Sequence, residues 1–135
     1  MKRISFFVHC EPVPQPRAKV STRGGFARAY VDSKHPSHAL KKAIREAFTG
    51  HKLEGPIGCE LLFRFARPKS HTKKQRESGW HTGKADIDNL QKLVFDALNG
   101  LTYDDDKQIA DVTACKRWAS DETDSGIYIS FWELT

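Results

Sequence analysis

The fold is organised around residues 86–100, which read D-I-D-N-L-Q-K-L-V-F-D-A-L-N-G. From Asn89 to Asn99 the apolar side chains recur at the three- and four-residue spacing of a helix that turns one stripe toward a core. The expected stripe comprises Leu90, Leu93, Val94, Ala97 and Leu101. Asn99 and Gly100 are typical of a left-handed C-cap, so we expect the helix to end there and the chain to turn back.

Acidic residues precede and follow this helix. Asp86 and Asp88 lie two residues apart, so in an extended segment both carboxylates project from the same side. Lys92 comes one helical turn after Asp88 and is expected to project toward the same place. The run 104–106 is all aspartate, and we expect it to converge with the first pair at one end of the helix. Like charges raise one another's pKa, and a bound cation removes that cost. Hard oxygen ligands in this number suit Mg²⁺ or Mn²⁺.

Strands and a second helix are predicted around this centre. Residues 2–9 and 57–65 alternate apolar and polar side chains as strands do, and a helix is expected to begin near Pro36 and to end at Gly50. Two further strands, at 109–118 and 127–132, are expected to form a hairpin through the polar link 120–126. The order strand, helix, strand, helix, strand, strand predicts a mixed sheet with two main helices packed on it. At 135 residues, the whole chain is expected to be one compact α+β domain.

Composition narrows the class of protein. No run of 18 apolar residues is present, so no transmembrane helix is expected, and residues 1–9 fit a strand better than a signal peptide. Cys10, Cys59 and Cys115 are widely spaced and odd in number, which predicts neither a disulfide framework nor a zinc site and favours the cytoplasm.

The charge is divided unevenly along the chain. Residues 1–85 contain 18 Lys and Arg against 6 Asp and Glu, whereas residues 86–135 contain 4 against 11. This division fits a first part that binds phosphates and a second part that binds a metal. An uneven solvated surface is the alternative.

Two basic segments lie in the first part of the chain. A stiff proline-rich loop at 12–16 leads to Arg17, Lys19, Arg23 and Arg28 with Gly24-Gly25 at the tip, and residues 27–31 are expected to return as a short hairpin. The second segment, 67–76, is long for a loop in a compact domain. The candidate DNA-binding residues are Arg17, Lys19, Arg67, Lys69, Lys73, Lys74 and Arg76. A solvent loop is an equal alternative for the first segment.

Two ring side chains follow the second basic segment. Trp80 is expected either to stack on bases or to pack against the sheet. His81 is a proton carrier in principle, but a solvated loop histidine is the favoured interpretation.

The motifs D-x-D-N-L-x-K at 86–92, D-A-L-N-G at 96–100 and D-D-x-Q at 105–108 resemble the RusA family of Holliday junction resolvases. The resemblance extends upstream to P-V-P-Q-P-R at 12–17 and R-P-K-S-H at 67–71, so it spans most of the chain. It implies a homodimeric, Mg²⁺-dependent endonuclease, with Mn²⁺ as a substitute, that nicks opposite strands of four-way junction DNA symmetrically. It also implies a cytoplasmic protein, bacterial or phage-encoded, that acts in DNA recombination and repair.

The resemblance also implies roles for individual residues. Asp86, Asp88 and Asp106 become metal ligands, and Lys92 lies beside the scissile phosphate, where it offsets developing charge. Asp106 is selected within the triple because D-D-x-Q matches residues 105–108, which leaves Asp105 as the second choice.

Structural roles are open for the same residues. Asp88 is a good N-cap, Lys92 and Asp96 are spaced as an exposed ion pair, and 104–106 is a hydrophilic turn. At the level of the whole protein, the alternatives are a non-catalytic binding module for branched or single-stranded nucleic acid and an inactive relative that acts as an assembly partner.

Overall fold

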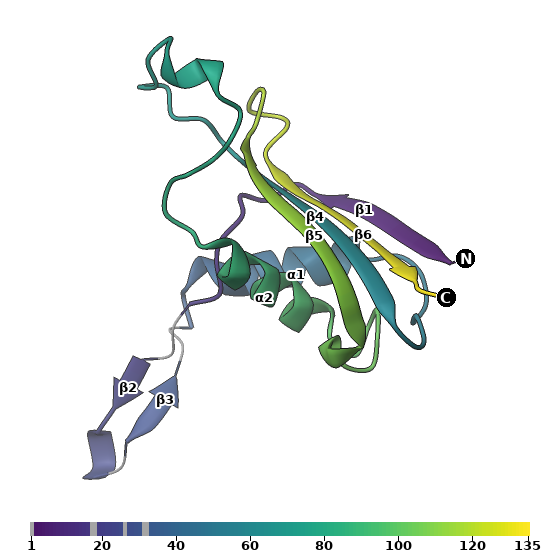
Figure 1. Ribbon diagram of the computed structural model, residues 1–135. Helices are drawn as coiled ribbons and strands as arrows, with labels where there is room; N and C mark the ends of the chain where they lie inside the picture. The colour runs from purple at the N-terminus through teal and green to yellow at the C-terminus, as the bar shows by residue number, and fades with distance from the viewer. Residues whose placement is uncertain (1, 17–18, 26, 31–32) are drawn as a thin grey trace.

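The computed structural model describes residues 2–16, 19–25, 27–30 and 33–135, and Figure 1 shows their arrangement. A four-stranded sheet has the order β1-β6-β4-β5. Its strands are β1 (Arg3–Val8), β4 (Ile57–Phe65), β5 (Ile109–Trp118) and β6 (Gly126–Glu133). The helices α1 (Pro36–Ala47) and α2 (Ile87–Leu98) cover one face of this sheet, so the predicted α+β class and element order are confirmed.

The two strand–helix–strand crossovers are present, but the expected terminal hairpin is wrong. Among the described strands, β5 pairs with β4, in parallel, while β6 lies between β1 and β4 and is antiparallel to both. The physical reason is the composition of β6, whose residues 126–133 are almost continuously apolar. Five of its eight residues are buried, which suits a central strand rather than an exposed edge.

The core lies between the sheet and the two helices. Leu40 and Ile44 of α1 and Leu90, Leu93 and Val94 of α2 are buried against the strands. The predicted α2 stripe is confirmed except at its end, where Leu98 is buried and Leu101 is only half-buried. α2 ends as predicted, with Asn99 at the C-cap and Gly100 at φ 83°.

Two segments extend away from this body (Figure 1). The predicted hairpin is confirmed as β2 (Lys19–Ser21) paired antiparallel with β3 (Arg28–Tyr30), with a short 3-10 turn at Arg23–Gly25. The other segment is the loop between β4 and α2, which contains a 3-10 turn at Gln75–Glu77. Over the described part of the chain, no helix has both the length and the apolar character needed to cross a membrane.

Candidate active site

Asp86 and Asp88 share one cavity at the N-terminal end of α2. Asp86 is the N-cap residue with an extended backbone, and Asp88 lies in the first helical turn, so α2 begins two residues earlier than predicted and the pair is not extended. Even so, both carboxylates line a hollow of about 590 Å³ together with Trp80, His81 and Lys116. Both residues therefore lie at the N-terminal end of a helix, where the positive end of the helix dipole stabilises negative charge.

The hydrogen bonds argue against the alternative that Asp88 serves only as the N-cap of α2. The cap position belongs to Asp86, not Asp88, and the Asp86 carboxylate makes no capping hydrogen bond. An aspartate that merely started the helix would accept a hydrogen bond from a backbone N–H of the first turn. The Asp86 oxygens are instead available to a ligand in the cavity.

The backbone before Asp86 is held in an uncommon conformation by Lys116 of β5. Ala85 has a φ of 103°, the one positive value among the described non-glycine residues. The Lys116 Nζ atom donates a hydrogen bond of 2.7 Å to the Ala85 carbonyl oxygen and a longer one of 3.4 Å to that of Gly83. A non-glycine residue in such a conformation is strained, and it persists only where its surroundings determine it. Lys116 thus fixes the turn that delivers Asp86 to the cavity.

The second acidic group surrounds the 3-10 turn Asp106–Gln108, and its three aspartates differ in what they bind. Asp104 forms an exposed ion pair of 2.8 Å with Lys52. The Asp105 side chain accepts a hydrogen bond of 2.9 Å from the Lys107 backbone N–H, which lowers the pKa of Asp105. The pKa of Asp106 is raised, first by partial burial and then by its hydrogen bond to Asp105 and the charge of that residue.

Gln108, the glutamine of the D-D-x-Q motif, has a structural role. Its side-chain oxygen accepts hydrogen bonds from the backbone N–H groups of Asp104 and Asp105, and its side-chain nitrogen donates to the Gly55 carbonyl oxygen. These contacts tie the acidic turn to the segment that enters β4. The run 104–106 is therefore more than a hydrophilic turn, because a side chain fixes its backbone and one of its acids has a raised pKa.

The two acidic groups do not converge within one chain, which corrects the expectation from the sequence. They lie at opposite ends of α2, whose 12 residues span about 18 Å. Among the described residues, no group of three or more His, Cys, Asp or Glu side chains is arranged to hold a metal ion. Lys92 is exposed on α2, outside the residues that line the Asp86–Asp88 cavity, and it belongs to none of the ion pairs found among the described residues.

The residues of the cavity nevertheless fit a magnesium ion. Mg²⁺ commonly takes only one or two carboxylates from the protein and completes its octahedron with waters and substrate phosphate oxygens. Asp86 and Asp88 supply two hard oxygen donors in an open hollow with room for both. They are the residues that would hold the ion, with Asp105 and Asp106 as a separate acidic pair.

The basic loop 66–78 divides its cations between two roles. The Arg67 guanidinium donates to the carbonyl oxygens of Gln75 and Ser78, at 3.0 and 2.8 Å, and lies over the ring of Trp118. The Arg76 guanidinium donates to backbone carbonyls of the same loop at 3.3 and 3.4 Å. These two arginines hold the loop together. The candidate lysines Lys69, Lys73 and Lys74 are exposed. Of the first basic segment, Arg17 lies outside the described residues, and Lys19 begins β2.

His81 is buried, which corrects the expectation of a solvated histidine. It is 8 % exposed, stacks on Phe65 with ring centroids 3.9 Å apart, and contacts the tilted ring of Trp118. Burial lowers the pKa of His81, and the positive charge of Lys116 lowers it further. His81 is therefore a neutral wall of the cavity at neutral pH. Trp80, in contrast, is exposed, although Arg117 of β5 covers one side of its ring.

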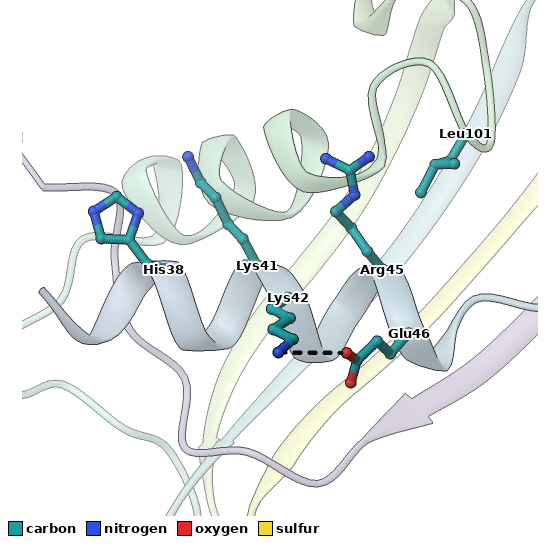
Figure 2. A pocket seen from close by; sticks show the side chains of 6 residues that line it. All are labelled: His38, Lys41, Lys42, Arg45, Glu46 and Leu101. Atoms are coloured by element: carbon teal, nitrogen blue, oxygen red, sulfur yellow. Dashed lines mark ion pairs between the residues drawn. The ribbon is translucent and has the colours of Figure 1, made fainter. Parts of the chain in front are cut away.

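A further hollow, of about 540 Å³, is lined by residues of α1 and by Leu101, which follows α2 (Figure 2). Its basic lining includes Lys41, Lys42 and Arg45 of α1. Lys42 forms a loose ion pair of 3.9 Å with Glu46, and Figure 2 shows Lys41 and Arg45 extending on the side of α2. Because its single carboxylate is paired, this hollow suits an anion and not a metal ion.

Sequence reasoning missed Lys116 and the role of Gln108. The signal for Lys116 was its position in β5, since it alternates with Ala114 and Trp118 on a face that packs toward the helix side. A lysine on that face needs polar partners, and it finds them in the loop before Asp86.

The aspartate pair at the N-terminus of α2 suits a divalent cation, and the exposed lysines of the neighbouring loop suit phosphate groups, so the site has the chemistry needed to act on a phosphodiester. The chain belongs to the family described as endodeoxyribonuclease RusA, which matches residues 9–130 and confirms the resemblance seen in the sequence. This family acts on junction DNA, and its resolvases generally depend on a divalent metal ion. A relative from Bacillus subtilis (strain 168), named as the uncharacterized protein YqaN, is 32 % identical over 132 aligned residues. The match covers 90 % of this chain and 92 % of the relative.

Proposed function

We propose that this protein is a Mg²⁺-dependent endonuclease that resolves four-way DNA junctions by paired, symmetric nicks in recombination and repair, and that it works as a homodimer. The observation that carries the proposal is the Asp86 carboxylate. It occupies a helix N-cap, is not used for capping, and shares an open cavity with Asp88. A protein that only binds DNA gains nothing from two carboxylates facing a polyanion, because each repels the phosphates.

The residues of the cavity have complementary roles in this proposal. When bound, Mg²⁺ supplies an activated water and stabilises charge on the phosphoryl and leaving oxygens. Asp86 and Asp88 hold the ion, and Lys116 holds the turn that orients Asp86. Lys92, on the next turn of α2, approaches the phosphate from the solvent side and offsets charge on its oxygens. The exposed lysines of loop 66–78 bind the flanking phosphates.

The position of Asp106 supports the homodimer. Because α2 separates Asp106 from Asp86 within one chain, a metal site that uses both residues takes them from two chains. A twofold dimer of this kind contains two equivalent composite sites, one for each strand to be cut. Partial burial raises the pKa of Asp106, and the neighbouring Asp105 raises it further, so a cation beside this carboxyl would be favourable.

The first experiment compares Asp86→Asn, Asp88→Asn and Asp106→Asn with wild type on a mobile four-way junction, in Mg²⁺ and in EDTA. Each change keeps the side-chain size and removes one anionic ligand, so cleavage is expected to fall by orders of magnitude while junction binding persists or tightens. Raised Mn²⁺ should restore part of the cleavage. Asp111→Asn, on an exposed position of β5, is the matched control and should cut normally. Site variants that cut as well as wild type, or a wild-type protein that binds the junction without cutting it, refute the endonuclease proposal.

A mixing experiment tests the composite site. In a dimer of one Asp86→Asn chain and one Asp106→Asn chain, one composite site carries both substitutions and the other carries none. The mixture should therefore regain nicking of a single strand, although each variant alone is inactive. If each site lay within one chain, both sites of the mixed dimer would be damaged and no activity would return. Sedimentation of the wild type only at monomer mass, with cleavage intact, would also contradict the homodimer.

A further inference from the structure

Trp80 is an exposed aromatic side chain on a fixed piece of backbone. Its side chain is 56 % exposed, the largest value among the described bulky apolar residues, ahead of Val112 at 38 %. The segment that carries it is bonded to the free edge of β5 on both sides of the tryptophan. The Trp118 N–H donates to the Gly79 carbonyl oxygen at 2.7 Å, and the His81 N–H donates to that of Lys116 at 3.2 Å. An exposed indole on such an anchored segment keeps its position without being buried.

One side of the indole is covered by a cation. The guanidinium carbon of Arg117 lies 4.4 Å from the centre of the Trp80 ring, and the two residues also form an isolated antiparallel bridge. Gly79 makes room for this arrangement, because a Cβ atom there would come within 2.8 Å of the Arg117 side chain. The guanidinium brings positive charge to the ring, so the pair offers a flat apolar surface beside a group that attracts phosphate.

Trp80 also lies between two hollows. On one side is the cavity that contains Asp86 and Asp88. On the other is a hollow of about 380 Å³, lined by the rings of Trp118 and His71 and by the polar side chains of Gln75, Ser78 and Thr82. Trp80 and Thr82 line both. A strand with a phosphate at the two carboxylates would therefore pass the indole, with an aromatic and polar recess beyond it.

We propose that Trp80 is the stacking platform for an unpaired nucleobase of the bound strand, and that the hollow beside His71 and Trp118 receives this base. The inference rests on the proposed function, because it assumes that the bound strand passes the Asp86–Asp88 cavity. A nucleobase fits the chemistry of the surface, since it has an aromatic face for the indole and polar edges for a recess that offers both ring and polar groups. Bases in a duplex are already stacked on their neighbours, so the ligand is a base without a partner.

The exposed cations of the same loop favour a nucleic acid over a neutral aromatic ligand. Lys69, Lys73 and Lys74 are exposed in the loop that leads into Trp80, and Lys84 follows it. Positive groups that track the backbone together with aromatic rings that take the bases are the combination found in proteins that bind single strands.

The test uses a single-stranded thymidine oligonucleotide that carries one 2-aminopurine, with EDTA present so that no cleavage is required. The variants are Trp80→Ala and Trp80→Phe. The control is Trp132→Phe, because Trp132 also lies against a guanidinium, that of Arg3 at 4.7 Å, but lines neither hollow. Thermal unfolding of each variant reports whether the fold is intact.

Wild type and Trp132→Phe should quench the 2-aminopurine fluorescence. Trp80→Ala should lose the quenching and bind the oligonucleotide roughly 5- to 150-fold more weakly, the effect of removing one stacking aromatic, while Trp80→Phe keeps most of the affinity. The quenching that depends on Trp80 should be absent when the 2-aminopurine is paired within a duplex.

Three results would overturn the proposal: a wild-type protein that fails to bind the oligonucleotide, equal losses in the Phe and Ala variants, or equal Trp80-dependent quenching in a duplex. None of these results depends on cleavage. Junction cutting in Mg²⁺, measured separately, decides the proposed function, so failure of the one is distinguishable from failure of the other.

Discussion

Replacing Ala85 with glycine should stabilise the protein, although a glycine substitution in a folded chain usually does the opposite. The φ of Ala85 is 103°, a conformation that costs a residue with a Cβ atom about 1–3 kcal/mol. Glycine adopts such a φ without that cost but loses about 0.5–1 kcal/mol in backbone entropy on folding. The net expectation for Ala85→Gly is a gain of about 1 kcal/mol in the free energy of unfolding. For a domain of this size, that gain corresponds to a rise of about 4 °C in the melting temperature.

The assay is urea unfolding followed by circular dichroism, with Ala110→Gly as the control. Ala110 is an exposed residue of β5 with an ordinary φ, so glycine there should lower the free energy of unfolding by about 0.5–1 kcal/mol. The two substitutions are chemically identical and are predicted to have opposite signs. A loss of stability in Ala85→Gly equal to that in Ala110→Gly would show that the turn before Asp86 is not strained. The hydrogen bonds from Lys116 would then not be needed to hold that turn.

Two other predictions concern charge. Changing Lys69, Lys73 and Lys74 together to glutamine should weaken junction binding. The slope of log affinity against log salt should fall by about 0.9 for each phosphate that is no longer neutralised, because fewer counterions are released. An unchanged slope would show that the loop does not contact the DNA. His81→Phe should keep the stack on Phe65 but abolish one component of the pH dependence of stability. Since burial lowers the pKa of His81 in the folded state below its value of about 6.5 in the unfolded chain, the unfolded chain binds more protons as the pH falls below about 6.5. The wild type should therefore lose stability relative to the variant in that direction, and parallel stability curves between pH 5 and 7 would contradict this account.

The elements of the fold could be predicted because each carries its own periodicity, but their pairing could not. The stripe of α2 and the alternation of β4 are local patterns, and each indicates its element correctly. The neighbours of β6 depend on which gap in the sheet its apolar residues fill best, and that gap lies between β1 and β4, which are far away in the chain.

The candidate site, too, could be predicted only in part. The aspartates are visible in a motif, whereas their separation depends on the length and direction of α2. The sequence around His81 is typical of a loop, and only the fold brings Phe65 and Trp118 against it.

The separation of the acidic groups has a consequence for how the proposed activity would be controlled. If Asp86 and Asp106 meet only across a dimer interface, a monomer contains both halves of a site and no complete site. Cleavage would then appear only when two chains have assembled, and each assembly would contain two sites related by a twofold axis. A four-way junction offers two equivalent strands in the same symmetry, so one dimer would engage both. A single chain that met ordinary duplex DNA would bind its phosphates without the means to cut them. On this reasoning the length of α2, which separates Asp86 from Asp106 within one chain, would also restrict cutting to the assembled dimer.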